Sequence, residues 1–440
     1  MPTNSTGICF SFRRSKTLLQ RTTRAAALSI GHLRVSNWWT ALAPAAPGGL
    51  SSHPLADSPG GSVTTSVATV PQPDLAALPS IVSALSARAG EHDREATFPH
   101  EGVELVHAAG LLTTTVHPRY GGPGAGVLDT ARLLSELGRG DPSVALVTAM
   151  TLFVHAGQGA EPSWPDEVYR RVLAESAERP VLINALRVEP ELGSPTRGGL
   201  PATTARRTAD GWRLSGRKIY STGSVGLRWM VVWARTDEPS PRVGGFLVRA
   251  GAPGIAIEPT WDHLGLRASA SHDVVFTDVP AEAPPGLSTP DTQRAPVLAF
   301  PLALPSIYLG VARNALDWLT GFLRDRVPSG LGKPLATLPR FQSGVGEIAA
   351  RITGAEEILF GIARRADEGD PAAAAQAGVA KVLATRLLIE AVEQAVALAG
   401  NPGLTRANPL QRHYRDVLCS RVHTPQDDAV LTGLGRSILG

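Results

Sequence analysis

The hydrophobic and polar positions after residue 73 follow three different patterns along the chain. In the first pattern, over residues 74–180, apolar residues recur every three or four positions, which predicts amphipathic helices. We expect the first helix to end at Gly90, because glycine commonly terminates a helix. The last helix before residue 160 is almost wholly apolar, so it should be buried on all sides. The predicted helices are residues 75–90, 100–110, 129–138 and 143–155.

The second pattern, over residues 181–285, is one of short apolar and polar alternations separated by Gly, Pro and Asp turns. Short strands at this spacing are typical of a small barrel or sandwich. Gly216 is interpreted as a tight turn between two short strands. No G-x-G-x-x-G joins a strand to a helix, which argues against a Rossmann dinucleotide site. The predicted strands are 181–187, 203–208, 212–214, 218–221, 229–235, 245–249, 255–258 and 272–276.

The third pattern is again helical and follows a Pro-rich linker at residues 281–296. Four long apolar-periodic stretches predict an antiparallel four-helix bundle. They are residues 302–326, 336–365, 371–399 and 425–439. The expected fold is therefore α+β, with a helical domain at 74–180, a β-barrel domain at 181–285 and a helical bundle at 286–440.

Composition limits the class of protein. The chain has 440 residues and 43% hydrophobic content, which suits two or three globular domains. No apolar run approaches the ~20 residues of a membrane helix. The two cysteines, Cys9 and Cys419, indicate neither a disulfide framework nor a metal site. We therefore expect a cytoplasmic protein without a membrane partner.

The basic isoelectric point of the chain results from the excess of basic residues in the N-terminal extension, residues 1–73. Of 42 basic and 39 acidic residues, six basic and one acidic lie in residues 1–73, so the remainder carries 36 basic and 38 acidic residues. A nucleic-acid partner is therefore not expected. The extension is rich in Ser, Ala, Gly and Pro, which favours a disordered tail or residues upstream of the true start codon over a transit peptide. One short helix is predicted at residues 38–39.

Candidate chemistry begins with two loops. The segment Tyr220-Ser221-Thr222-Gly223 ends a predicted strand with three hydroxyls and a flexible glycine. Such a strand end suits a flat polar ring, because hydroxyls and N–H groups meet its heteroatoms and glycine permits close approach. A second turn-rich loop lies about 25 residues upstream, at residues 188–195.

Three motifs in these segments resemble the central β-domain of the acyl-CoA dehydrogenase superfamily. They are Glu189-Pro190-x-x-Gly193-Ser194, the run G-R-K-I-Y-S-T at residues 216–222, and G-L-R-A-S at 265–269 followed by V-F-T-D-V at 275–279. The resemblance implies a flavin cofactor, FAD or FMN, bound between the two loops. The flavin-binding residues would be Val188, Gly193, Ser194, Tyr220, Ser221 and Thr222.

The catalytic position departs from that family. Dehydrogenases of this family use a glutamate nine residues after the Arg of an R-D pair to remove a substrate proton. Here the pair is Arg415-Asp416, and nine residues onward is Thr424. The alternative family position, near Phe300, lies in an apolar segment without an acid.

His423 immediately precedes Thr424 and becomes the candidate catalytic residue, with Thr424 beside it. We interpret Thr424 as a helix N-cap and Pro425 as the first helical residue. A helix N-terminus next to His423 would disfavour a second positive charge and keep the imidazole neutral. A neutral imidazole can hydrogen-bond a peroxide or accept a proton. The competing interpretation makes His423 a plain helix-entry residue.

Two further departures follow from the resemblance. The R-x-x-F-G and Q-x-x-G-G motifs that grip FAD lack their Arg, Phe and Gln here, although Arg326 lies nearby. These losses favour FMN or loosely bound reduced FAD. The flavin monooxygenase branch of the superfamily, which includes dibenzothiophene monooxygenase, also lacks the glutamate and often keeps a histidine. The chain is thus expected to be a reduced-flavin monooxygenase of a small substrate, with a flavin reductase as a possible partner and a dimeric or tetrameric state.

Alternatives remain open at this stage. A dehydrogenase with a displaced base would use Glu347, Glu356 or Asp427. A binding protein that kept the fold without catalysis is the other alternative. His155 and Thr151, on the apolar helix predicted at 143–155, are weaker candidates for the substrate cavity, and His155 has a competing interpretation as a buried structural residue.

Overall fold

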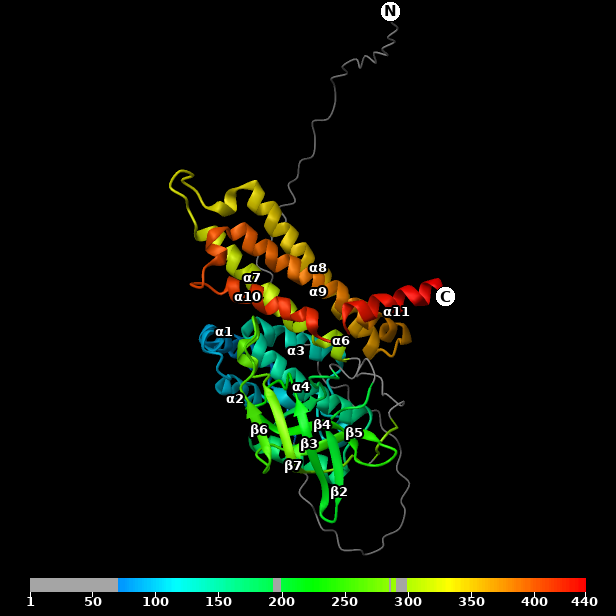
Figure 1. Cartoon of the computed structure of the whole chain (residues 1–440). Coiled ribbons are helices and arrows are strands. Elements are labelled where there is room, and N and C mark those ends of the chain that lie inside the picture. The colour runs from blue at the N-terminus through cyan, green and yellow to red at the C-terminus, as the bar shows by residue number, and fades with distance from the viewer. Residues whose placement is uncertain (1–69, 193–198, 285, 290–298) are drawn as a thin grey trace, which may run out of the picture. The chain divides into compact units, whose positions relative to one another are not determined.

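The protein is described here by a computed structural model that covers residues 70–192, 199–284, 286–289 and 299–440 (Figure 1). The predicted helix at residues 38–39 lies outside this range. The first part of the described chain is helical, and its first helix does not end at Gly90. That helix ends instead at Ala96, which has a left-handed φ of 52°. The helices are α1 (Leu78–Glu95), α2 (His100–Ala108), α3 (Val127–Gly140), α4 (Pro142–Ala160) and α5 (Asp166–Glu178).

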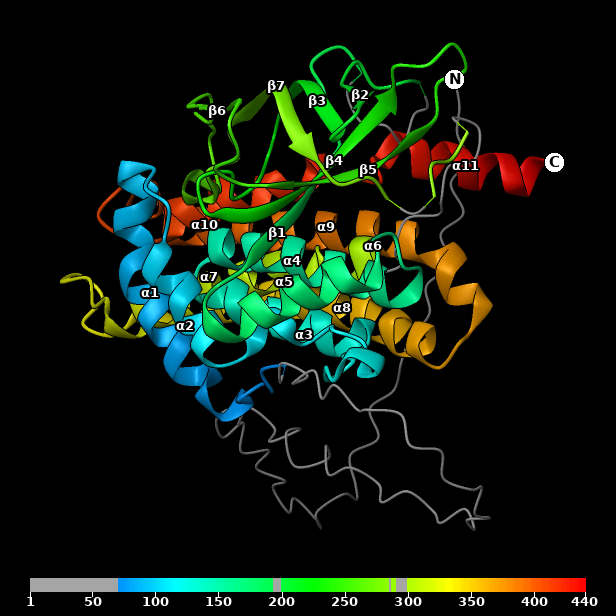
Figure 2. The ribbon, with the colours of Figure 1, turned by 90° about the horizontal axis from the view of Figure 1, so that it is seen from below.

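The apolar helix α4 is buried, as predicted, and extends beyond the predicted residues 143–155. Its N-cap is Asp141, whose carboxylate accepts the Ser143 N–H at 2.7 Å. By length and composition alone α4 is able to cross a membrane, but two-thirds of its apolar window is buried inside the protein, as in a core helix. It packs against the first strand (Figure 2).

The described residues of the middle part form one seven-stranded sheet. The strand order is β1-β4-β2-β3-β7-β6, and β5 pairs with β4. The continuation of β7 pairs back onto β5, through Glu282 with Leu247 and Ser288 with Val243, so the sheet closes into a small barrel. The strands are β1 (Leu182–Leu186), β2 (Thr204–Thr208), β3 (Gly211–Lys218), β4 (Leu227–Thr236), β5 (Val243–Arg249), β6 (Ile255–Glu258) and β7 (Asp273–Ala281).

The prediction of a turn at Gly216 is wrong. Gly216 lies inside β3, at a shift in the register of β3 with β7. Its φ is 153°, and a Cβ there would lie 2.5 Å from the Thr203 hydroxyl. The glycine therefore marks a bulge within one strand rather than a break between two strands.

Helices return after residue 298, with two differences from prediction. The helix expected at 302–326 is two helices, because Pro305 stands between them as the N-cap of the second. α7, α8, α9 and α10 form the bundle. The prediction of 425–439 as its fourth helix is wrong, because α10 packs on α7 and α9 whereas α11 has no buried residues. The helices are α6 (Ala299–Ala303), α7 (Ser306–Asp325), α8 (Pro339–Asp367), α9 (Pro371–Ala399), α10 (Leu410–Leu418) and α11 (Asp427–Leu439).

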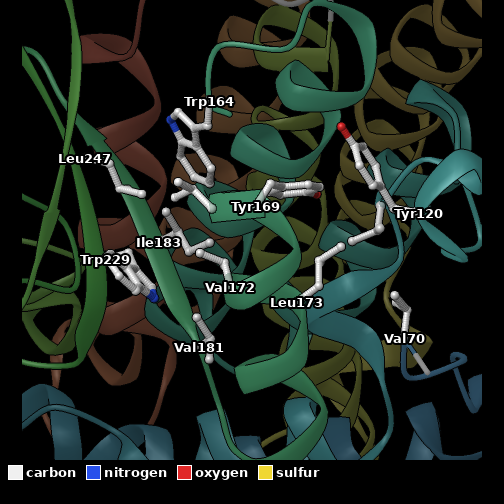
Figure 3. Packing of buried hydrophobic residues seen from close by; sticks show 12 residues of the cluster. Val70, Tyr120, Trp164, Tyr169, Val172, Leu173, Val181, Ile183, Trp229 and Leu247 are labelled. Atoms are coloured by element: carbon white, nitrogen blue, oxygen red, sulfur yellow. The ribbon is translucent and has the colours of Figure 1, made fainter. Parts of the chain in front are cut away.

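An aromatic cluster joins the first helices to the barrel (Figure 3). Tyr169 on α5 is fully buried, with the rings of Tyr120 and Trp164 edge-on to it at 4.7 and 5.7 Å. Trp229 on β4 and Ile183 on β1 complete the contact with the sheet. Burial of each such large side chain contributes about 1.5–3 kcal/mol to the free energy of unfolding.

A glycine contact joins the first helices to the bundle. α3 packs on α7 so closely that a Cβ at Gly310 would lie 2.0 Å from the Ser135 carbonyl oxygen. Gly138 of α3 approaches the Ile307 carbonyl in the same way. These two glycines set the spacing between the helices.

We predict that Gly310→Ala lowers the free energy of unfolding by about 2–3 kcal/mol, because the methyl group forces α3 and α7 apart. Gly321→Ala on the same helix is the matched control, since no atom lies within 4 Å of its added Cβ. That control should be neutral or stabilising by up to about 1 kcal/mol. Urea unfolding of both variants is the measurement, and equal effects would contradict the close packing at Gly310.

Candidate functional site

The segment Tyr220–Gly223 follows β3 and presents an aromatic ring to solvent. Tyr220 has a left-handed φ of 54° and is 54% exposed. Trp261 and His263 stack on each other at 3.6 Å, and the Tyr220 ring meets both edge-on, at 6.4 and 5.8 Å. The ring is therefore held in place by its neighbours while it remains accessible to a planar ligand. We call residues 220–223 the ligand turn.

Polar atoms of the ligand turn are organised by a second segment, residues 265–271, which we call the docking loop. The Thr222 hydroxyl accepts a hydrogen bond from the Ser271 hydroxyl at 3.0 Å, and the Gly223 N–H donates to the Ser269 carbonyl at 2.8 Å. The Ser221 hydroxyl is buried, and no hydrogen-bond partner contacts it among the residues that the structure describes. Because a buried hydroxyl is normally satisfied, Ser221 fits a ligand that supplies the missing partner.

The motif that begins at Glu189 contains a buried ion pair. Glu189 is buried, and its carboxylate accepts hydrogen bonds from Lys218 Nζ at 2.6 Å and from the Thr203 hydroxyl at 2.6 Å. Burial raises the pKa of Glu189, but the hydrogen bonds from Lys218, Thr203 and the Ala202 N–H, together with the charge of Lys218, outweigh it, and the pKa is lowered. Burial lowers the pKa of Lys218 to about 8. This ion pair joins the two predicted ligand loops inside the barrel.

The rest of that loop is only partly described. The Val188 carbonyl accepts the Ile219 N–H at 3.0 Å, which places the loop directly beside the ligand turn. Gly193 and Ser194 lie outside the described residues, so their predicted contact with a flavin stays a prediction.

The docking loop also contacts the bundle. The Asp416 carboxylate on α10 accepts the Leu266 N–H at 2.8 Å, and a Cβ at Gly265 would lie 2.4 Å from the Arg415 carbonyl oxygen. Arg415 makes a bidentate pair with Asp93 on α1, at 2.5 and 2.9 Å. The docking loop is thereby fixed between the ligand turn on one side and α10 on the other.

His423 lies one short 3-10 helix, Cys419–Val422, after α10. Its Nε2 is 2.5 Å from the Tyr308 hydroxyl on α7. Lys381 on α9 is buried nearby, and its Nζ donates to the Arg421 carbonyl at 3.3 Å and to Asp427 at 3.1 Å. Burial, and then the charge of Lys381, lower the pKa of His423 to about 4. The imidazole is therefore neutral at physiological pH.

The reason that the sequence suggested for this neutrality is wrong. α11 begins at Asp427 with Gln426 as its N-cap, so Thr424 is not a cap and His423 stands four residues before the helix. The dipole of a helix acts mainly within its first turn. The physical cause is instead desolvation and the neighbouring cation.

The sequence pattern does not by itself single out Tyr308 and Lys381. Tyr308 stands in an apolar helix, where an aromatic residue is usually core. Lys381 did carry a signal, because it lies four residues after Ala377 and seven before Leu388, on the buried face of α9. A lysine on such a face needs a partner, and that requirement points to a polar cluster.

The acids considered as displaced bases all pair with cations or amides of the bundle. Glu356 pairs with Arg313 at 2.7 Å, and Asp427 pairs with Lys381 and Arg386. Glu347 accepts from Gln394 at 2.7 Å and is 56% exposed. These contacts give each carboxylate a structural function and do not favour any of them as a base.

Contacts of the two α4 candidates also favour structural functions. The Thr151 hydroxyl accepts the Ile183 N–H of β1 at 3.0 Å. His155 is fully buried, with Nδ1 at 2.8 Å from the Tyr169 hydroxyl in the aromatic cluster. Both side chains tie α4 to its neighbours, while Nε2 of His155 is buried with no hydrogen-bond partner among the described residues, so the cavity role of the two residues stays a prediction.

Comparison with known proteins defines the family. Residues 81–161, 187–279 and 302–427 match the N-terminal, middle and C-terminal domains of acyl-CoA dehydrogenases. The chain is 34% identical over 346 residues to the acyl-CoA dehydrogenase homologue YdbM of Bacillus subtilis, a match that covers 78% of this chain and 90% of that protein. The chain belongs to the acyl-CoA dehydrogenase family, as its motifs predicted.

Solved structures share this fold. KijD3 in complex with FMN and dTDP-3-amino-2,3,6-trideoxy-4-keto-3-methyl-D-glucose superposes with a TM-score of 0.73 at 26% identity, over 85% of this chain and 97% of that chain. A nitrososynthase from Micromonospora carbonacea superposes with a TM-score of 0.69 at 25% identity, over 83% of this chain and 96% of that chain. Family and fold together make the protein a flavin-dependent oxidoreductase.

We predict that Asp416 makes the stability of the fold pH-dependent. Burial raises its pKa to about 7, above the value of about 4 in an unfolded chain. A raised pKa contributes stability that is present at low pH and is lost as the pH rises toward 7. Asp416→Asn, which is neutral throughout, should therefore gain stability relative to wild type between about pH 4 and pH 7.

Urea unfolding at these two pH values is the measurement. Asp317→Asn is the control, since that exposed carboxylate pairs only with Arg139 among the contacts of the described residues. A stability difference between Asp416→Asn and wild type that stays constant with pH would contradict the raised pKa.

Proposed function

We propose that the protein is a monooxygenase that uses reduced flavin and O2 to oxygenate a small molecule. The observation that carries this proposal is His423. A neutral imidazole, hydrogen-bonded to Tyr308, stands next to the position where dehydrogenases of the family carry a glutamate. Without a carboxylate there, the α-proton of an acyl thioester has no strong base to remove it.

The ligand turn fits a flavin. The exposed Tyr220 ring offers a stacking surface, and the unpartnered Ser221 hydroxyl offers a polar contact for a ring heteroatom. Thr222 and the backbone beside Val188 would border the same ring. When bound in its reduced form, a flavin supplies two electrons and reacts with O2. Either FMN or FAD suits this part of the site, because the residues named would contact only the ring.

His423 would act on the oxygen or substrate side of this site. Because its pKa is about 4, it enters the reaction uncharged and able to donate a hydrogen bond. Tyr308 on α7 and Lys381 on α9 are buried beside the half-buried His423, which limits the access of water and strengthens the hydrogen bonds there. Thr424, half-buried beside His423, is proposed as a secondary contact.

Structural relatives support this choice. KijD3 was solved with FMN and an amino-sugar nucleotide, and the Micromonospora protein is named a nitrososynthase. A reaction of this class needs a supply of reduced flavin, so we propose a separate flavin reductase as partner. We further propose a dimer or tetramer, the state expected for this fold.

The second candidate is an acyl-CoA dehydrogenase. It is favoured by the name of the Bacillus relative, which shares 34% identity with this chain. The two functions separate cleanly under anaerobic conditions. We predict that butyryl-CoA or another acyl-CoA leaves the bound oxidised flavin unbleached, and bleaching of its visible absorbance would establish the dehydrogenase instead.

We predict that His423→Ala lowers oxygenation of an accepted substrate about a hundredfold when reduced FMN and O2 are supplied, because the site loses its hydrogen-bonding imidazole. Product yield is measured by mass spectrometry, together with H2O2 released into solution. His100→Ala, on the exposed start of α2, is the matched control. A loss smaller than about threefold would remove His423 from the mechanism.

A further inference from the structure

His423 and three side chains from separate elements form one polar cluster. Tyr308 comes from α7, Lys381 from α9 and Asp427 from the start of α11. Tyr308 and Lys381 are each only 1% exposed. Buried polar groups are costly unless each is satisfied, so this cluster is expected to adopt one arrangement of protons.

The direction of the Tyr308–His423 hydrogen bond follows from burial. Desolvation, with the nearby Cys419 and Asp416, raises the pKa of Tyr308 well above its ordinary value, so the phenol keeps its proton. Among the described residues His423 is the one hydrogen-bond partner of this buried phenol, so the O–H donates and Nε2 of His423 accepts over 2.5 Å, because the opposite direction would leave the buried O–H unsatisfied. A neutral imidazole whose Nε2 accepts carries its single proton on Nδ1.

The charge of the cluster prevents a second proton from binding. The Lys381 ammonium is held between the Arg421 carbonyl and the Asp427 carboxylate. Asp427 also pairs with Arg386, so its negative charge is shared between two cations. The Lys381 ammonium, which shares the Asp427 carboxylate with Arg386, therefore disfavours an imidazolium at His423.

We propose that Tyr308 and Lys381 are positioning residues that hold His423 as a neutral imidazole protonated at Nδ1. His423 then acts in the site as a hydrogen-bond donor rather than as a base, because its basic nitrogen is already occupied by Tyr308. This inference rests on the proposed function for its catalytic consequence. The protonation state of His423 is a property of the protein without any ligand, so it is testable independently of activity.

The direct test is nitrogen-15 NMR of the full chain labelled at histidine, with the His423 signals identified by their loss in His423→Gln. The expected wild-type spectrum has a protonated Nδ1 and an unprotonated Nε2. Tyr308→Phe removes the donor, and an Nε2-protonated form should then appear. Protonation of Nε2 in the wild type, or an unchanged tautomer in Tyr308→Phe, would overturn the proposal.

Lys381 is tested through the pH at which His423 becomes charged. Lys381→Met should raise the pKa of His423 by about one unit or more, whereas Lys381→Arg, which keeps the cation, should leave it nearly unchanged. If Lys381→Met does not fold, Asp427→Asn provides the opposite test, because removal of the carboxylate should lower the pKa of His423. A His423 pKa that responds to none of these variants would exclude Lys381 from the assignment.

Kinetics connect the tautomer to turnover. Tyr308→Phe should lower kcat for oxygenation about tenfold while KM and FMN affinity stay unchanged, because the hydrogen bond orients His423 without touching the ligand turn. Tyr414→Phe on α10 is the control. The NMR result does not depend on activity, so a chain without oxygenase activity would contradict the proposed function, whereas a wrong tautomer would contradict only this inference.

Discussion

The contact of the docking loop with α10 is the constraint on which the candidate site depends. Asp416 accepts the Leu266 N–H, and Gly265 lies against the helix backbone so closely that no side chain fits between them. The same loop holds the ligand turn through Ser269 and Ser271. One short segment thus fixes both the aromatic ring of the barrel and, through α10, the position of His423.

Buried charges reinforce this arrangement. Glu189 with Lys218 joins the barrel loops, Arg415 with Asp93 joins α10 to α1, and Lys381 with Asp427 joins α9 to α11. Burial of an ion pair costs desolvation energy, so such pairs add little net stability over apolar contacts. Removal of one partner leaves an uncompensated charge, which makes each pair a strong constraint on which surfaces meet. Near His423, desolvation and then the Lys381 cation keep the imidazole uncharged.

The sequence predicts elements correctly where an apolar repeat is long. It fails where a single glycine or proline is able either to break a helix or strand or to lie within it. α9 begins and ends as predicted, because its apolar repeat is sustained and Asp370 caps it. Gly90 and Gly216 were both interpreted as breaks, yet one lies within a helix and the other within a strand. Pro305 breaks a helix that was predicted as continuous. Local patterns do not reveal whether tertiary packing offsets the cost of a glycine.

The site shows the same division. Tyr220, Ser221 and Thr222 were recognised because they are contiguous in a motif, and the structure places them beside Val188. Tyr308 and Lys381 were not, because their contacts with His423 and its neighbours join residues that are far apart in the sequence. The cause of the neutral imidazole was likewise not visible in the sequence, since it depends on burial.

The most direct measurement is a crystal structure of the chain grown with FMN. The account predicts that the isoalloxazine ring packs on Tyr220, contacts the Ser221 hydroxyl and shares one cavity with the His423 imidazole, within a subunit or across a subunit contact. A flavin bound elsewhere, or a ring on Tyr220 whose cavity excludes His423, would contradict it.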